Sequence, residues 1–140
     1  MAEGQAENTT QLLAQYALMY LFRRDEQVQS ITWYKLCDNP WTPKYANRDR
    51  TLNHWHTMRI KMGEETFEIL QTGLLRGGIR GYRGEPDLFC WDARKRIWFF
   101  AEAKGKGDSL KPEQIEWIEI YQRVLRNAPN VRIYRVLVSE

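Results

Sequence analysis

The chain has 140 residues, of which 43% are hydrophobic, and its formal net charge is only +3 at pH 7. This size suits a single domain over residues 10–140, behind a polar segment, residues 1–9, that we expect to be disordered. No apolar stretch reaches the roughly 20 residues of a membrane span. The two cysteines make no disulfide framework, so we expect an intracellular, cytoplasmic location. The small net charge does not identify a nucleic-acid partner, and local basic clusters have to do so.

The first half of the chain predicts three helices and a loop. Composition and spacing favour one helix from Thr10 to about Phe22 and a second over Asp25–Cys37. The turn formers in Asp38–Pro43 end the second helix. Residues 44–56 are polar, basic and aromatic and are expected to form a loop, and weaker helical periodicity follows over Met58–Gln71.

Two short apolar and aromatic runs, Leu88–Trp91 and Ile97–Ala101, have the length of strands, and the polar break between them suits a hairpin turn. We expect them to pair as adjacent antiparallel strands. Because side chains alternate along a strand, Glu102 and Lys104 share one face. Asp87 joins them only if opposed residues have numbers that sum to an odd value, as 87 and 102 do. A slip of one residue would turn Asp87 to the other face.

The chain then predicts a helix and a last strand. Pro112 fits the first position of a helix, whose expected apolar stripe consists of Ile115, Ile118, Tyr121, Val124 and Leu125. Residues 131–138 are expected to form a buried strand. Strand, helix and strand in this order suggest a right-handed parallel crossover. It places Gln114 in the first turn of the helix, near the carboxyl end of the strand that bears Glu102.

Two carboxylates and a lysine on neighbouring strands are typical of a metal-dependent nuclease. Mg²⁺ and Mn²⁺ take hard oxygen ligands and are usually held by one or two carboxylates plus substrate phosphate. Asp87 and Glu102 supply such ligands, and the main-chain carbonyl of Ala103 is placed to add a third. Lys104 is predicted either to position the attacking water or to contact the scissile phosphate.

Basic residues gather at two places where a DNA backbone could bind. One group lies in the aromatic segment after Pro40 and includes Lys44, Arg48 and Arg50. The other precedes Asp87 and comprises Arg76, Arg80 and Arg83, the favoured phosphate ligands. Lys106 adds a cation just after Lys104. The pair His54 and His56 lacks the clustered ligands of a zinc site, and we expect a surface or packing role for it.

The motif residues Gly84–Leu88, Glu102–Leu110, Gln114 and Trp117 resemble the VRR-NUC domain of the PD-(D/E)XK nuclease superfamily. That group includes the catalytic domain of the Fanconi-associated nuclease and small stand-alone phage proteins. Its pattern reads G-x-P-D-L, then E-V-K-G-P-x-D-x-L-S-x-x-Q-x-x-W. This chain has Ala103 for the usual valine and Lys106 for the usual proline, and neither change removes a ligand. The resemblance covers about residues 84–138.

The resemblance implies an α/β fold with a restriction-endonuclease-like mixed β-sheet core flanked by helices on both faces. It also implies a Mg²⁺- or Mn²⁺-dependent DNA endonuclease with Asp87 and Glu102 as metal ligands, Lys104 as the catalytic lysine and Gln114 beside them. Stand-alone members are similar to Holliday-junction resolvases and are often homodimers. A homodimer acting on four-way or branched DNA is therefore expected, in the host cytoplasm if the chain is phage-encoded.

Nucleases of this superfamily usually add a glutamate from an early helix. Glu26 is preferred for that position as a further metal ligand, with Glu65 and Glu68 as rivals. Two alternative functions stay open beside the endonuclease: a DNA-binding module of the same fold that does not cut, and a nuclease subunit that requires a partner chain.

Overall fold

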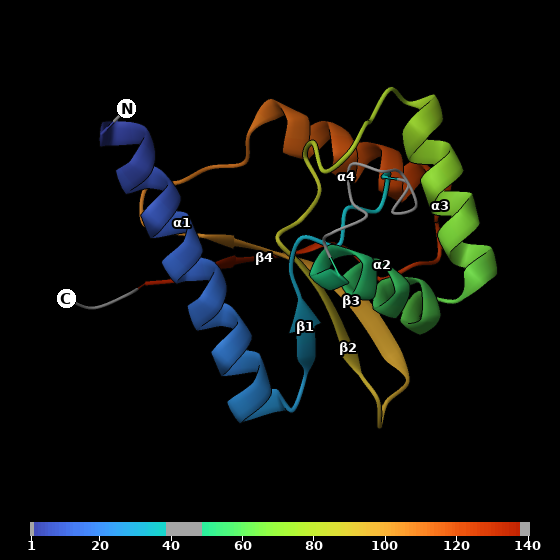
Figure 1. Cartoon of the computed structure of the whole chain (residues 1–140), viewed down its shortest axis with the longest axis horizontal. Helices are drawn as coiled ribbons and strands as arrows, with labels where there is room; N and C mark the ends of the chain where they lie inside the picture. Colours follow the sequence, from blue (N-terminus) through green and yellow to red (C-terminus); the bar gives the residue numbers. More distant parts are fainter. Residues whose placement is uncertain (1, 39–48, 138–140) are drawn as a thin grey trace.

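The computed structural model of the chain describes residues 2–38 and 49–137, with side chains from residue 12 and, after the gap, from residue 53. The described residues form a four-stranded sheet flanked by helices (Figure 1). The strands are β1 (Gln29–Ile31), β2 (Leu88–Asp92), β3 (Ile97–Lys104) and β4 (Arg132–Arg135). The helices are α1 (Ala2–Leu21), the π-helix η1 (Phe22–Glu26), α2 (Asp49–Met62), α3 (Glu64–Arg76) and α4 (Pro112–Val124).

The sheet is mixed and has the order β1-β2-β3-β4. Strand β2 pairs antiparallel with both β1 and β3, while β3 and β4 are parallel and joined through α4. The expected hairpin is confirmed, with a turn held by Asp92, whose carboxylate accepts hydrogen bonds from the amides of Arg94 (3.0 Å) and Lys95 (3.2 Å). The strand–helix–strand order after β3 thus yields the expected parallel pair.

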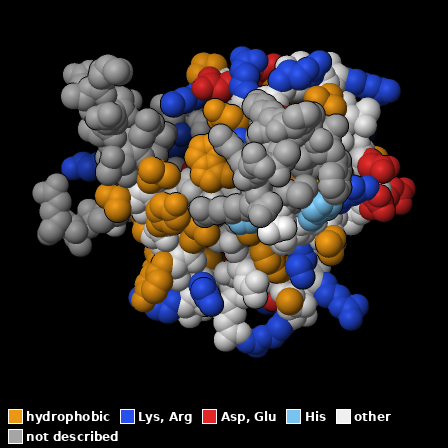
Figure 2. Space-filling view, in the orientation of Figure 1, with side chains coloured by type: hydrophobic (Ala, Val, Ile, Leu, Met, Phe, Trp, Pro, Cys, Tyr) orange, Lys and Arg blue, Asp and Glu red, His pale blue; other side chains and the backbone are white. Residues whose placement is uncertain are grey.

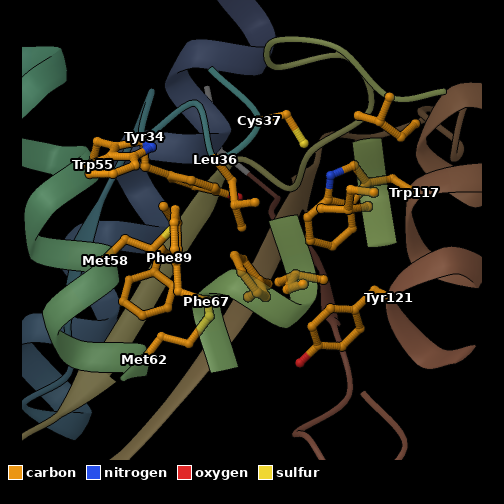
Figure 3. Close-up of a cluster of buried hydrophobic side chains, with 14 of the residues drawn as sticks. Tyr34, Leu36, Cys37, Trp55, Met58, Met62, Phe67, Phe89, Trp117 and Tyr121 are labelled. Atoms are coloured by element: carbon orange, nitrogen blue, oxygen red, sulfur yellow. The ribbon is translucent and has the colours of Figure 1, made fainter. Parts of the chain in front are cut away.

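Helices cover both faces of the sheet. Helix α1 packs Ala14 and Leu18 against Leu88 and Phe99 on one face. Helices α2, α3 and α4 lie on the other face (Figure 1), where aromatic side chains dominate the core. Figure 3 shows this cluster between α2 and α4, and its labelled members include Tyr34, Phe67, Phe89, Trp117 and Tyr121. Because strand side chains alternate between the two faces of the sheet, they contribute to two separate hydrophobic cores. The expected α/β architecture with helices on both faces is confirmed.

The amino-terminal half differs from the sequence prediction in two elements. The expected helix over residues 25–37 is replaced by η1, strand β1 and an irregular segment. Gln27 adopts φ 55, which ends the helical turn, and the β-branched Ile31 suits the strand that pairs with β2. The expected loop over residues 44–56 is wrong from residue 49 onward, because α2 begins there, while residues 44–48 lie outside the described residues.

Helix α2 forms because three apolar side chains recur on one side of it. Trp55, Met58 and Met62 are spaced by three and four residues and are all buried. Gly63, at φ 97, then separates α2 from α3, so the expected helix over Met58–Gln71 is in fact the end of one helix and most of another. Helix α1 begins at Ala2 and so includes most of the segment expected to be disordered.

Two carboxyl-terminal expectations need correction. Strand β4 is short, and its side chains are mostly exposed because it lies at the edge of the sheet and pairs only with β3. In α4 the buried residues are Trp117, Ile120 and Tyr121, whereas Ile115 is exposed. The helix does begin at Pro112, as the sequence predicts. Among the described residues, no helix has the length and apolar character needed to cross a membrane.

Candidate active site

The acidic pair lies where β2 begins and β3 ends. The register pairs Leu88 with Ala101, so opposed residues have numbers that sum to an odd value and Asp87 stands opposite Glu102. The register condition set by the sequence is thereby confirmed. Glu102 and Lys104 lie on the same face at the end of β3, and both are almost fully buried, at 3% and 2% exposure.

Asp87 and Glu102 are linked through each other's backbone. The amide of Asp87 donates to Glu102 Oε1 at 2.9 Å, and the amide of Ala103 donates to Asp87 Oδ2 at 3.1 Å. These reciprocal bonds fix both carboxyl groups at the start of β2 and the end of β3, the two central strands. The carboxyl oxygens thus converge without depending on a flexible side-chain rotamer.

Lys104 and Gln114 complete a closed network around Glu102. Gln114 donates from Nε2 to Glu102 Oε2 at 2.6 Å and accepts at Oε1 from Lys104 Nζ at 2.8 Å. Lys104 Nζ also lies 3.4 Å from Glu102 Oε2. Gln114 Oε1 accepts in addition from the amide of Lys111 at 2.9 Å, which ties the network to the start of α4. The expected placement of Gln114 beside the strand that bears Glu102 is what the structure shows.

Each residue of the loop before Asp87 has a structural task. Gly84 has φ 74, and a Cβ there would stand 2.2 Å from the backbone oxygen of Glu113, so only glycine lets the loop approach α4 this closely. The Glu85 carboxyl group accepts from the amides of Lys35 (3.1 Å) and Leu36 (3.2 Å). This loop is therefore clamped between α4 and the segment that follows β1.

The Pro86 carbonyl provides a third anchor for the same loop. It accepts a hydrogen bond of 2.5 Å from the hydroxyl of Tyr34, a side chain with no exposed surface. Burial is also the main reason that the pKa of the Tyr34 hydroxyl is raised well above its usual value, so this group stays a donor. Asp87 follows directly after a backbone that is held on both sides.

Burial raises the pKa of both carboxyl groups of the pair. Removal from water raises the pKa of Asp87, and burial followed by the charge of Asp87 raises the pKa of Glu102 to about 7. Two acids in one desolvated place repel each other once ionised, and a bound divalent cation relieves that repulsion. The donor set fits Mg²⁺ or Mn²⁺, which prefer carboxylate oxygen.

In the described part of the chain, Asp87 and Glu102 have no third acidic residue beside them that could bind the same metal ion. Within residues 2–38 and 49–137, no group of three or more His, Cys, Asp or Glu side chains is placed to hold a metal ion. A cation bound by Asp87 and Glu102 would therefore depend on a backbone carbonyl, waters and substrate phosphate for its other ligands, as Mg²⁺ commonly does.

A pocket of about 210 Å³ opens beside the acidic pair. Its wall includes Gln15 of α1, and Thr32 and Trp33 after β1. Asp87 and Gln114 line it from the side of the network just described. Gln15 and Thr32 are buried, and neither the Gln15 amide nitrogen nor the Thr32 hydroxyl has a hydrogen-bond partner among the described residues.

The predicted helical glutamate is not brought to the pair. Glu26 ends η1, before Gln29, which pairs with Trp91 far along β2, whereas Asp87 precedes the first residue of that strand. Four residues of strand separate position 91 from position 87, about 13 Å at the usual rise. Glu26 is exposed there. Glu65 and Glu68 are also exposed, on α3, and Glu68 lines a different pocket between α3 and α4.

The residue that α1 does supply to the site is Gln15. The sequence held one signal for it, because Gln15 is a polar residue on the buried stripe formed by Ala14, Leu18 and Phe22. Nothing in the sequence singled out Trp33 or Tyr34, since their segment was expected to be helical. Glu85 lay inside the motif, but its contacts to a distant backbone segment become visible only in the fold.

Of the arginines before Asp87, two lie beside the site and one lies in a separate pocket. Arg80 and Arg83 line a groove beside Gly84, and Arg76 lines the pocket between α3 and α4. Arg80 donates to the carbonyls of Leu75 and Ile79, both at 2.8 Å, so part of its guanidinium holds the end of α3. Lys106 is exposed in the turn after β3.

The remaining predicted basic residues and the histidines have the following positions. Lys44 and Arg48 lie outside the described residues, as does the side chain of Arg50. The ring of His54 makes a 2.5 Å hydrogen bond from Nδ1 to the carbonyl of Thr32, which is a packing role. His56 makes an edge contact with Trp55 at 5.2 Å.

A mixed sheet between two helical layers, with Asp87, Glu102 and Lys104 gathered where its central strands β2 and β3 begin and end, is the arrangement of a nuclease-type domain. Residues 62–137, more than half of the chain, match the family model of the VRR-NUC domain. The chain therefore belongs to the VRR-NUC family, and its fold is consistent with the restriction-endonuclease-like fold of that family. A comparison with curated proteins finds no match. The family match includes α3, β2, β3, α4 and β4 and leaves out α1, β1 and most of α2.

Proposed function

We propose that this protein is a Mg²⁺- or Mn²⁺-dependent endonuclease that hydrolyses phosphodiester bonds in DNA, with four-way or otherwise branched DNA as its substrate. The observation that carries the proposal is the convergence of the partly buried carboxyl group of Asp87 and the buried carboxyl group of Glu102 beside the buried ammonium group of Lys104. A buried charge cluster of this kind is costly to a fold and is typical of a functional site.

The side chains of the site divide the work as follows. Asp87, Glu102 and the main-chain carbonyl of Ala103 hold the cation. When bound, the cation supplies a water of lowered pKa and offsets charge on the phosphate in the transition state. Lys104 places its ammonium group next to the carboxylates, where it orients the attacking water or contacts the scissile phosphate. Gln114 keeps Lys104 and Glu102 at their present separation through its two hydrogen bonds.

Cations around the site provide the sequence-independent part of DNA binding. Arg83, which lies 4.0 Å from Glu116, flanks the site beside Gly84, whereas Arg76 lies further away, in the separate pocket between α3 and α4. Lys106 and Lys111 flank it on the side of β3, both exposed. Contacts of such residues with backbone phosphates position DNA without reading its sequence and weaken with added salt.

A homodimer is part of the proposal. Helix α1 exposes Leu13, Tyr16 and Tyr20, at 55%, 49% and 61%, on one side of the helix. Figure 2 shows apolar side chains gathered on this side of the molecule. An exposed apolar face of this kind is typical of a protein interface, and a two-fold pair of active sites suits a symmetric junction. The molecular mass in solution, measured by light scattering for the wild type and for Tyr16→Glu, tests this part.

The cleavage test compares Asp87→Ala and Lys104→Ala with the wild type on linear duplex, single-strand, flap and four-way DNA in Mg²⁺. Both variants are expected to cut at least about 100-fold more slowly, the scale of losing one electrostatic contact to the transition state. Binding to the same DNA in EDTA should change little. Asp92→Asn is the matched control, because Asp92 is a buried carboxylate at the far end of β2 and asparagine keeps its turn contacts. Unchanged cleavage by either site variant refutes the assignment.

One observation favours the alternative of a DNA-binding module that does not cut. Both oxygens of Glu102 are already engaged by protein donors, Asp87 through its amide and Gln114 and Lys104 through their side chains. If that closed network persists, Glu102 Oε2 is not free for a cation, which then has Asp87, the carbonyl of Ala103 and one lone pair of Glu102 Oε1. Calorimetric titration with Mn²⁺ separates the alternatives: heat that disappears in Glu102→Gln supports the nuclease, and a titration without heat supports the binding module. Cleavage that requires an added partner chain would indicate a subunit of a larger nuclease.

A further inference from the structure

The pocket beside the acidic pair contains polar groups that the proposed cleavage reaction does not use. Gln15 is 7% exposed and Thr32 is 2% exposed, and both line the pocket. The amide nitrogen of Gln15 and the hydroxyl of Thr32 have no hydrogen-bond partner within the described part of the chain. Buried polar groups without partners are costly, so two of them in one pocket wall indicate a ligand that bonds to them.

Two large aromatic side chains stand at the same pocket. Trp33 and Tyr82 line it, are 48% and 54% exposed, and contact each other edge to face with ring centroids 5.6 Å apart. Trp33 has φ 49, a backbone conformation that a bulky residue rarely adopts and that the surrounding structure has to impose. The ammonium group of Lys35 lies 5.3 Å from the centre of the Tyr82 ring. The fold thus holds an indole and a phenol ring partly in water beside the acidic pair.

The charge and size of the pocket limit what it accepts. The carboxyl groups of Asp87 and Glu113 line it, with Lys111 as the one cation among its lining residues, so a phosphate group is disfavoured there. Its volume of about 210 Å³ is below the range of roughly 300–1,000 Å³ that is usual for drug-sized ligands, and it cannot admit a duplex. A small, neutral, planar group with hydrogen-bonding edges meets all of these conditions.

We propose that this pocket takes one unpaired nucleobase of the DNA substrate, stacked on Trp33, with Tyr82 beside it, and hydrogen-bonded by Gln15 and Thr32. This inference rests on the proposed function, since Asp87 belongs both to the pocket and to the acidic pair. A base that has left its stack exposes hydrogen-bonding edges and a ring face, and proteins bind such bases by aromatic stacking together with polar contacts. The base would lie next to the phosphate that is cut, so branched DNA with an unpaired nucleotide at that place is the favoured substrate.

The experiment measures binding rather than cleavage, by fluorescence anisotropy in EDTA with the full chain. The probe is a four-way junction in which a single abasic site is moved through the nucleotides around the branch point. Trp33→Gly removes the ring, and glycine accepts the φ of position 33 without strain. Trp33→Phe restores a ring, and Ile60→Ala removes a large side chain that is 75% exposed on α2. Circular dichroism verifies that every variant is folded.

At one position of the scan the abasic site should weaken wild-type binding about tenfold, the effect of losing one stacked base. Trp33→Gly should weaken binding of intact DNA to the same extent and lose all sensitivity to that abasic site. Trp33→Phe and Ile60→Ala should keep the sensitivity. A scan that is flat for the wild type, or an abasic effect that Trp33→Gly retains in full, overturns the pocket assignment.

The same data separate this inference from the proposed nuclease function. A chain that senses the abasic site but does not cut DNA in Mg²⁺ retains the base pocket and loses the nuclease assignment. A chain that cuts DNA but gives a flat abasic scan retains the nuclease and loses the base pocket.

Discussion

Gln114→Ala removes the side chain that joins the three parts of the proposed site. The side-chain amide of Gln114 makes hydrogen bonds to the side chains of Glu102 (2.6 Å) and Lys104 (2.8 Å) and to the backbone amide of Lys111 (2.9 Å). Without it, the buried Lys104 ammonium group has only Glu102 Oε2, at the longer distance of 3.4 Å, as a partner among the described side chains.

The expected loss of stability follows from these contacts. A hydrogen bond to a charged group contributes about 1.5–3 kcal/mol and one between neutral groups about 1 kcal/mol, and water that enters the space replaces part of this. We expect a free energy of unfolding lower by about 2–4 kcal/mol, measured by urea denaturation at constant m. Cleavage in Mg²⁺ should fall about 10- to 100-fold, the usual effect of removing a residue that orients a metal ligand.

Gln122→Ala is the matched control, because Gln122 is exposed on the same helix. Its free energy of unfolding and its cleavage rate should both stay close to those of the wild type. If Gln114→Ala behaves like Gln122→Ala in both assays, the network around Glu102 does not organise the site and the reasoning fails.

Further predictions concern the loop before Asp87 and the pH dependence. Gly84→Ala places a methyl group against the backbone of Glu113 and should lower the free energy of unfolding by about 3 kcal/mol and abolish cleavage. Gly107→Ala is its control, because Gly107 has a similar φ of 83 but open space around it. It should lower the free energy of unfolding by only about 1–2 kcal/mol. Burial raises the pKa of Glu85 to about 8, so the native state keeps a proton that the unfolded chain has already lost above its own pKa of about 4.3. In EDTA the protein should therefore lose stability as the pH rises from about 5 to 8, by up to about 1.4 kcal/mol per pH unit from this group, and Glu85→Gln should flatten that slope in urea titrations at pH 6 and 8. A wild-type stability that rises over this range contradicts the assignment.

The part of the site that could be predicted from the sequence is the part that local rules determine. The hairpin that carries Asp87 and Glu102 has short strands, a short turn and one register that places both acids together. Pro112 marks the start of α4, and the position of Gln114 follows from it. These features depend on residues that are close in sequence, so periodicity and turn chemistry are sufficient to find them.

The parts that the sequence did not reveal depend on contacts between distant segments. Strand β1 has three residues, and its partner β2 lies about 60 positions further on, so the helical spacing of the β-branched residues in this segment predicts a helix that the distant pairing overrides. Gln15 is a polar residue on the apolar stripe of α1, but it reaches the site only because α1 packs on the face of the sheet that carries Leu88 and Phe99, a contact between distant segments. The residue type of Glu26 suits a further metal ligand from an early helix, but the pairing of β1 places Glu26 at the opposite end of β2 from Asp87.

The most direct measurement is the rate of cleavage of a labelled four-way junction by the wild type and by Glu102→Gln, over a range of Mg²⁺ concentrations that starts from EDTA. Glutamine keeps the size of the side chain and its contact with the amide of Asp87, but it removes the charge that a cation needs. The wild type should cut only after Mg²⁺ is added, and Glu102→Gln should remain inactive at every concentration while it still binds the junction. Cleavage by the wild type in EDTA, or equal cleavage by both proteins in Mg²⁺, would contradict the account.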